Sequence, residues 1–250
     1  MPVDGDGLAP DAVPADADVI FVTPSHQSPT GVRMPMARRR QLLELAERND
    51  FLIVEDDYEF EMSFLEAPSP ALRSLDRHGR VIYVGSFSKS LFPGLRLGYL
   101  VGPPDLIREA RALRALMLRH PPGHLQRTVS NFLALGHYDS LIRRMRGEFA
   151  ERHDAMAQAL ERCGLTIAGR SSFGGTSFWI EGPEGLDADA LADTLRADGV
   201  LIESGAPFFA LRDGPCRFFR MAYSSIDASR IPEGVERVVA RMGRTGTSAV

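Results

Sequence analysis

Three short apolar runs, at 18–23, 51–54 and 81–84, occur in the first third of the chain. Each run is too short for a stable helix and is typical of a strand that is buried on both faces. Between the first two runs, apolar positions recur at helical spacing over 36–48, and Pro35 precedes them where a helix needs no N–H donor. The order strand, helix, strand predicts a parallel sheet.

Polar residues follow each of the three predicted strands. They form the segments Thr23-Pro24-Ser25-His26, Glu55-Asp56-Asp57-Tyr58 and Gly85-Ser86-Phe87-Ser88-Lys89. Ligands of parallel α/β sheets bind at the carboxyl ends of the strands. The polar side chains are therefore expected to gather at one edge of the sheet.

The pattern changes in the second half of the chain. Helical spacing predicts helices over 103–119 and 124–135, and a long helix over 138–162 that could join two domains. The remaining predicted elements are strands at 165–168, 176–181, 200–203 and 216–222, and helices with aspartate caps at 187–198 and 227–242. These elements predict a smaller α+β unit, and only the ends, 1–7 and 243–250, are expected to be loose.

Length and charge limit the class of protein. The chain has 250 residues, 44% of them hydrophobic, which is enough for one large or two modest domains. A net charge of -4 gives no general attraction to nucleic acid. The basic run Arg38-Arg39-Arg40 is expected to be a solvated helix face.

Cysteine, histidine and hydropathy patterns exclude further classes. Cys163 and Cys216 lack metal-ligand spacing, so we expect no disulfide framework and no zinc site, but inert thiols in a reducing compartment. His120 and His124 have no carboxylate or cysteine at ligand spacing, and no metal is expected. No apolar run reaches membrane-spanning length and no signal-peptide pattern occurs, which predicts a cytoplasmic protein without a membrane partner.

Lys89 is the only lysine among the 29 lysine and arginine residues of the chain. A guanidinium stays protonated, whereas a lysine amine can lose its proton and form a Schiff base with an aldehyde. A composition biased toward arginine could leave one surface lysine by chance. The alternative is that this lysine is kept for its chemistry.

A Schiff base to a phosphorylated pyridine aldehyde needs three further groups, and all three occur near Lys89 or at a neighbouring strand end. Asp56 or Asp57 could hold a proton on the ring nitrogen, so that the ring accepts electrons from a substrate carbanion. Tyr58 could donate to the ring oxygen. The hydroxyls and the guanidinium that phosphate recognition favours are those of Ser86, Ser88 and Arg96.

The segment Ser86-Phe87-Ser88-Lys89-Ser90-Leu91-Phe92-Pro93-Gly94-Leu95-Arg96-Leu97-Gly98 resembles the lysine segment of fold-type I, pyridoxal-phosphate-dependent aminotransferases of class I/II. The segments 24–31 and 55–58 are more similar to the aminotransferase-like domain of MocR-type regulators in the GntR superfamily. This resemblance implies the fold of the aspartate-aminotransferase-like transferases. It assigns residues 1–150 to part of a large domain with a mainly parallel sheet, and 151–246 to a smaller α+β domain.

The resemblance also assigns roles to residues. Lys89 would form the Schiff base with pyridoxal 5′-phosphate and move the substrate proton, and Asp56 would pair with the pyridine nitrogen. Tyr58 would contact the ring hydroxyl. The phosphate would be held by Ser86, Ser88 and Arg96.

A late strand supplies the expected substrate contact. Phe218-Phe219-Arg220-Met221-Ala222-Tyr223-Ser224 is similar to the strand whose arginine grips the substrate carboxylate in this family. This similarity assigns the role to Arg220, with Arg217 as the less favoured alternative.

Two features depart from the family pattern. Ser28 stands where aminotransferases carry asparagine in an Asn-Pro-Thr-Gly motif, and its shorter side chain changes the contact to the ring hydroxyl; His26 and Gln27 could compensate. The first residues resemble a mid-domain stretch, so we expect the chain to lack the first half of the large domain. That half would supply a phosphate loop, a stacking aromatic and several strands.

Two functions from different classes follow from the resemblance. One is a cofactor- or effector-sensing domain of a transcription factor, whose DNA contact would come from a winged-helix domain outside this chain. The other is a free-standing aminotransferase that moves an amino group between an amino acid or amine and a 2-oxo acid. We rank the regulator domain first because of Ser28 and the motifs. A third possibility is a fragment without function of its own, and a homodimer is expected for the full-length protein.

Overall fold

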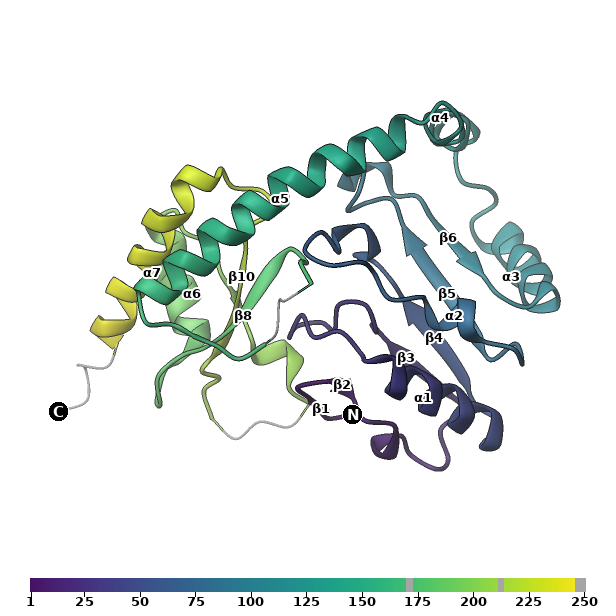
Figure 1. The fold of residues 1–250 in the computed structure, drawn as a ribbon, viewed down its shortest axis with the longest axis horizontal. Helices are drawn as coiled ribbons and strands as arrows, with labels where there is room; N and C mark the ends of the chain where they lie inside the picture. The colour runs from purple at the N-terminus through teal and green to yellow at the C-terminus, as the bar shows by residue number, and fades with distance from the viewer. Residues whose placement is uncertain (170–172, 211–213, 246–250) are drawn as a thin grey trace. The chain divides into compact units, whose positions relative to one another are not determined.

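The computed structural model describes residues 1–169, 173–210 and 214–245 (Figure 1). The chain divides into two compact units. The first comprises residues 1–27, 32–63 and 67–145, and the second comprises 28–31, 64–66 and the described part of 146–250. Each unit is built around a four-stranded sheet of its own.

The sheet of the first unit has the order β3-β4-β5-β6 (Figure 1). Its strands are β3 (Val19–Val22), β4 (Leu52–Asp56), β5 (Val81–Ser86) and β6 (Gly98–Val101). The first three are parallel, which confirms the predicted parallel sheet. Strand β6 runs antiparallel to β5 and was not predicted; its first residue, Gly98, is the last residue of the lysine motif.

Helices and short hairpin strands complete this unit. The bounds are β1 (Val3–Asp4), β2 (Gly7–Leu8), α1 (Met36–Arg48), α2 (Leu72–Leu75), α3 (Pro104–Met117), α4 (Gly123–Ala134) and the first part of α5 (His137–Arg162). Helix α1 has the bounds that its apolar spacing predicted, and Leu42 and Ala46 of this helix pack in the core with Ile20, Ile53 and Val81. The core therefore lies where the strand, helix, strand pattern predicted it.

The prediction that residues 1–7 are loose was wrong. Strands β1 and β2 pair as an antiparallel hairpin. The Arg38 guanidinium donates to both carboxylate oxygens of Asp4, at 2.6 and 2.7 Å, and this hydrogen-bonded pair lowers the pKa of Asp4 to about 2. A bidentate contact of this kind orients the hairpin against α1.

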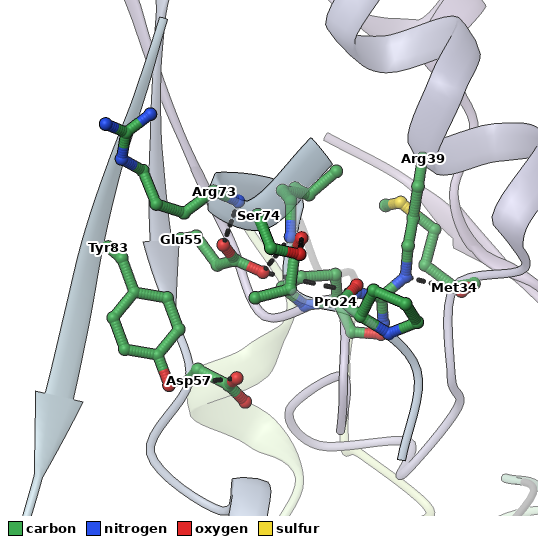
Figure 2. Close-up of polar contacts among 11 residues, drawn as sticks. Pro24, Met34, Arg39, Glu55, Asp57, Arg73, Ser74 and Tyr83 are labelled. Atoms are coloured by element: carbon green, nitrogen blue, oxygen red, sulfur yellow. Dashed lines mark hydrogen bonds and ion pairs between the residues drawn. The ribbon is translucent and has the colours of Figure 1, made fainter. Parts of the chain in front are cut away.

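Arg39 contradicts the prediction of a solvated basic face, since its side chain is fully buried. Its guanidinium donates to the carbonyl oxygens of Met34, Pro70 and Pro24 at 3.0, 3.0 and 2.7 Å (Figure 2). One of its nitrogens lies 4.0 Å from the carboxylate of Glu55, which is also buried. Arg40, the next residue, is exposed. Arg39 therefore ties three chain segments together, and Arg40 is the exposed residue of the basic run.

Glu55 extends this buried contact to the next element. Its carboxylate accepts hydrogen bonds from the backbone N–H groups of Leu72 and Arg73, at 2.7 and 2.9 Å, where α2 begins (Figure 2). Burial raises the pKa of Glu55, and these two hydrogen bonds oppose that rise. Glu55 therefore fixes the end of β4 to α2.

Two glycines allow β5 and β6 to approach each other. Gly98 pairs with Ser86 in the ladder, and a Cβ on Gly98 would lie 2.7 Å from the carbonyl oxygen of Gly85. A Cβ on Gly85 would collide with the ring of Tyr99. The strands on either side of the lysine loop thus require glycine for steric reasons.

Gly98→Ala is expected to destabilise the protein by about 1 to 3 kcal/mol, because the new methyl group meets backbone atoms that cannot move aside. The matched control is Gly94→Ala in the same loop, where the nearest atom to the new methyl would be 3.7 Å away in the Phe92 ring. Urea unfolding measures both changes. Equal midpoints for the two variants would contradict the register of β5 and β6.

The second unit has an antiparallel sheet of order β7-β8-β10-β9. Its elements are β7 (Thr166–Ile167), β8 (Ser177–Glu181), α6 (Ala188–Ala197), β9 (Glu203–Ser204), β10 (Phe218–Ala222), α7 (Ile231–Thr245) and the second part of α5. Helices α6 and α7 pack against each other. The α+β character was predicted correctly.

Details of this unit differ from the predictions. Asp187 caps α6 as predicted, because its carboxylate accepts from the N–H groups of Asp189 and Ala190. Asp227 makes no side-chain cap, and a 3₁₀ turn over 228–230 precedes α7. Strand β9 starts at Glu203 instead of spanning 200–203. The predicted loose tail falls mostly on residues 246–250, which lie outside the described residues.

No helix within the described ranges is long and apolar enough to cross a membrane. The same ranges hold no group of three or more histidine, cysteine, aspartate or glutamate side chains that could bind a metal ion.

Candidate active site

The ends of β4 and β5 bring the predicted cofactor residues of the first unit to one edge of the sheet. Asp56, the last residue of β4, lies beside Val84, and β5 continues to Ser86. Because the two strands are parallel, the segments that follow them start at the same edge. Those segments carry Tyr58 and Lys89.

Lys89 lies on a loop that joins β5 to β6. The N–H of Phe87 donates to the carbonyl oxygen of Leu97 at 3.1 Å and closes this loop. The N–H of Ser88 donates to the hydroxyl of Ser86 at 3.1 Å, so the two predicted phosphate-binding serines are in contact. Arg96 has left-handed backbone angles, with φ 50° and ψ 38°, and an exposed side chain. The loop therefore presents two hydroxyls, an amine and a guanidinium within eleven residues.

The Lys89 amine contacts two residues of the segment after β4. Its Nζ lies 3.1 Å from Oε1 of Glu59 and 5.6 Å from the centre of the Tyr58 ring. The hydroxyl of Tyr58 makes a long hydrogen bond of 3.5 Å to the carbonyl oxygen of His26, in the segment after β3. All three polar segments predicted to meet do so here, but Glu59 was not predicted.

The three consecutive acids at the end of β4 have different environments. Side chains of a strand alternate between its two faces, and Glu55 is buried while Asp56 is half-buried. Asp57 is buried, and its Oδ2 accepts a hydrogen bond from the hydroxyl of Tyr83 at 3.2 Å (Figure 2). The Asp56 carboxylate has no hydrogen bond or ion pair with any described residue, and burial raises its pKa. Among the described residues, Asp56 is therefore the acid of the three whose carboxylate makes no hydrogen bond, although Oδ1 of Asp57 is also buried without a partner.

A second contact anchors the residue after Lys89. The hydroxyl of Tyr138, at the start of α5, donates to Glu61 at 2.5 Å and lies 2.9 Å from the hydroxyl of Ser90. Burial raises the pKa of Tyr138, which keeps its phenol protonated as a donor. Glu61 and Tyr138 were not predicted, and the acidic run from 55 to 61 is the one signal that could have indicated Glu59 and Glu61.

A groove of about 740 Å³ opens beside the base of the lysine loop. Arg96 lines it together with Arg111, Arg114, Arg119 and His120. These four arginines form no ion pair with a described residue. Cations grouped without carboxylates create a positive potential, so an anion that reaches Arg96 would be attracted.

The remaining predicted residues, Ser28 and Arg220, belong to the second unit. Arg220 on β10 forms an ion pair with Glu203, its ladder partner on β9, and its guanidinium lies 5.8 Å from the Phe208 ring centre. The Nε of Arg220 is buried without a hydrogen-bond partner among the described residues. Arg217, the alternative, pairs with Glu181. Arg220 thus keeps one donor available.

Comparison with known proteins decides the family. The family model described as aminotransferase class I and II matches residues 4–238. The chain belongs to this family. The solved structure of LysN, an alpha-aminoadipate aminotransferase from Thermus thermophilus, is 31% identical with a TM-score of 0.90, covering 100% of this chain and 66% of that one. That structure is complexed with N-(5′-phosphopyridoxyl)-L-leucine, and the predicted fold class is confirmed.

Among curated proteins, this aminotransferase-family chain is similar to transcriptional regulators. It is 54% identical over 236 residues to the HTH-type transcriptional regulator TauR of Rhodobacter capsulatus, which is 94% of this chain and 49% of TauR. It is 40% identical over 163 residues to the probable rhizopine catabolism regulatory protein MocR of Rhizobium meliloti, which is 65% of this chain and 33% of MocR. The chain thus spans at most about half the length of these two relatives. The predicted resemblance to the aminotransferase-like domain of MocR-type regulators is confirmed.

Pyridoxal 5′-phosphate is the cofactor that membership of the aminotransferase class I and II family implies. The residues of the first unit fit it, because Asp56 is a half-buried carboxylate without a partner among the described residues, and a protonated ring nitrogen would offset the cost of its burial. The lysine loop offers the amine, and its hydroxyls and guanidinium suit a phosphate.

Proposed function

We propose that the chain is the pyridoxal-phosphate-binding, aminotransferase-like domain of a MocR-type regulator of the GntR superfamily, and that it senses an amino compound through the cofactor bonded to Lys89. The observation that carries this proposal is the 54% identity to TauR over 94% of the chain. The site supports it through Lys89, the one lysine of the chain, and through Asp56 at the same sheet edge, whose carboxylate has no partner among the described residues.

In this proposal, the residues of the first unit hold and tune the cofactor. When bound, pyridoxal phosphate supplies an aldehyde and an electron sink for a carbanion next to an amino group. Asp56 holds a proton on the ring nitrogen, and Tyr58 donates to the ring oxygen. Ser86, Ser88 and Arg96 bind the phosphate.

The proposal also gives roles to two residues of the second unit. Ser28 replaces the amide of the family motif as the contact to the ring hydroxyl. Arg220 grips the carboxylate of an amino acid or 2-oxo acid, and for that it must exchange its ion pair with Glu203 for the substrate. The protein acts as a homodimer when full length, and DNA contact belongs to a winged-helix domain outside the residues of this chain.

The second candidate is a free-standing aminotransferase, favoured by the likeness to LysN. In that case the Lys89 amine also moves a proton at the substrate carbon during every cycle. The two functions use the same cofactor residues and differ in turnover.

Turnover separates the two candidates. The purified chain, loaded with pyridoxal phosphate, is mixed with a panel of amino donors in the presence of 2-oxo acids, and both the visible absorbance and the new amino acid are measured. A sensor is expected to change its absorbance with a particular donor while forming no more product than the cofactor present. Product in large molar excess over the cofactor, and absent with Lys89→Arg, would contradict the sensor and support the aminotransferase.

A further inference from the structure

Glu59 is a nearly buried carboxylate held beside a half-exposed amine. Its side chain is 6% exposed, compared with 46% for Lys89. The carbonyl oxygen of Glu59 accepts the N–H of Met62 at 2.9 Å, which fixes its backbone in the 3₁₀ turn over 60–62. The carboxylate is therefore positioned by the fold, and the flexible lysine side chain reaches it.

Lys89 supplies a positive charge beside Glu59. His26 is buried, both of its ring nitrogens lack a hydrogen-bond partner among the described residues, and burial lowers its pKa. A neutral imidazole does not compensate the charge of a carboxylate. The Lys89 ammonium, with the face of the Tyr58 ring at 5.6 Å, does so.

We infer that Glu59 is a positioning residue that holds the Lys89 ammonium in the cofactor-free protein and opposes its conversion to a reactive amine. An amine attacks an aldehyde only after it loses a proton, and a neighbouring carboxylate stabilises the protonated form. In the covalent step, a Nζ–carbon double bond replaces the aldehyde C=O, the oxygen leaves as water, and the ammonium proton passes to solvent. The claim about the covalent step rests on the proposed function. The claim that Glu59 holds the Lys89 ammonium does not.

The amine can be tested without any cofactor because Lys89 is the only lysine. Trinitrobenzenesulfonate reacts with unprotonated amines, and peptide mass spectrometry separates the label on Lys89 from the label on the amino terminus. Glu59→Gln keeps the size of the side chain and removes its charge. In this variant, Lys89 is expected to be labelled about two- to fivefold faster, because the free energy of a partly exposed ion pair corresponds to a ratio of this size. Glu59→Asp, which keeps the charge but shortens the reach, is expected to accelerate labelling as well.

The control is Glu44→Gln, an exposed acid of α1 whose loss changes net charge equally and touches no part of the site. It is expected to label at the parent rate. Circular dichroism and urea unfolding identify variants that keep the parent fold. Unchanged or slower labelling of Lys89 in folded Glu59→Gln or Glu59→Asp would overturn the inference.

Titration with pyridoxal phosphate then separates the two proposals. If the proposed function is right, Glu59→Gln is also expected to bond the cofactor about two- to fivefold more tightly, measured by its visible absorbance. Faster labelling without any cofactor band in parent or variant would support the hold on the amine and refute the proposed function. Weaker bonding by the folded variant would overturn the inference that Glu59 opposes the covalent step.

Discussion

Lys89→Arg is expected to abolish covalent binding of pyridoxal phosphate. A guanidinium remains protonated and cannot attack an aldehyde, and the chain has no second lysine to replace it. The parent chain, mixed with the cofactor, should develop a visible absorbance band that borohydride removes. The variant should leave the spectrum of the free cofactor unchanged.

The same variant is expected to stay folded. Arginine keeps the positive charge beside Glu59, and the side chain at this position is half-exposed, so the free energy of unfolding should remain within about 1 kcal/mol of the parent. Urea unfolding checks this expectation. A phosphopyridoxyl group that borohydride fixes on folded Lys89→Arg at a position other than the amino terminus, in the amount found on the parent chain, would refute the role of the lysine.

Arg39→Met is expected to lower the free energy of unfolding by about 3 to 5 kcal/mol, because it leaves the buried Glu55 charge without its cation. The substitution also removes the guanidinium that donates hydrogen bonds to the carbonyl oxygens of Met34, Pro70 and Pro24. Urea unfolding followed by circular dichroism measures the loss.

Arg40→Met is the matched control for that experiment. Arg40 is the next residue of the same helix and is exposed, so its replacement should change the free energy of unfolding by no more than about 0.5 kcal/mol. Equal effects of the two substitutions would show that Arg39 has no special structural role.

The comparison of these two arginines shows what the sequence could not predict. The apolar spacing of 36–48 gave the bounds of α1 correctly, because burial of one helix face is a local property of the pattern. Whether a charged residue in that run is buried depends on acceptors from other segments. Pro24, Pro70 and Glu55 come from three such segments, and no local pattern links them to Arg39.

The candidate site shows the same division. The motifs predicted that Tyr58 and Lys89 follow neighbouring strands, and parallel strand order made their proximity predictable. The sequence pattern alone left Asp56 and Asp57 as alternatives, because it does not show that the hydroxyl of Tyr83 on the adjacent strand donates a hydrogen bond to Asp57. Glu59 was missed because its significance comes from its distance to Lys89, and an acidic run does not show which carboxylate points to the amine.

Strand β6 was missed for a related reason. The strand starts at Gly98, the last residue of the lysine motif, and its pairing with β5 depends on two glycines that remove side chains from the contact. A glycine in sequence does not reveal which backbone approaches it.

The central claim is that Lys89 bonds pyridoxal phosphate. The most direct test is to mix the purified chain with the cofactor, reduce the mixture with borohydride and map the modified peptide by mass spectrometry. We expect a phosphopyridoxyl group on Lys89 alone. An unmodified Lys89 in folded protein, or modification confined to the amino terminus, would contradict the claim.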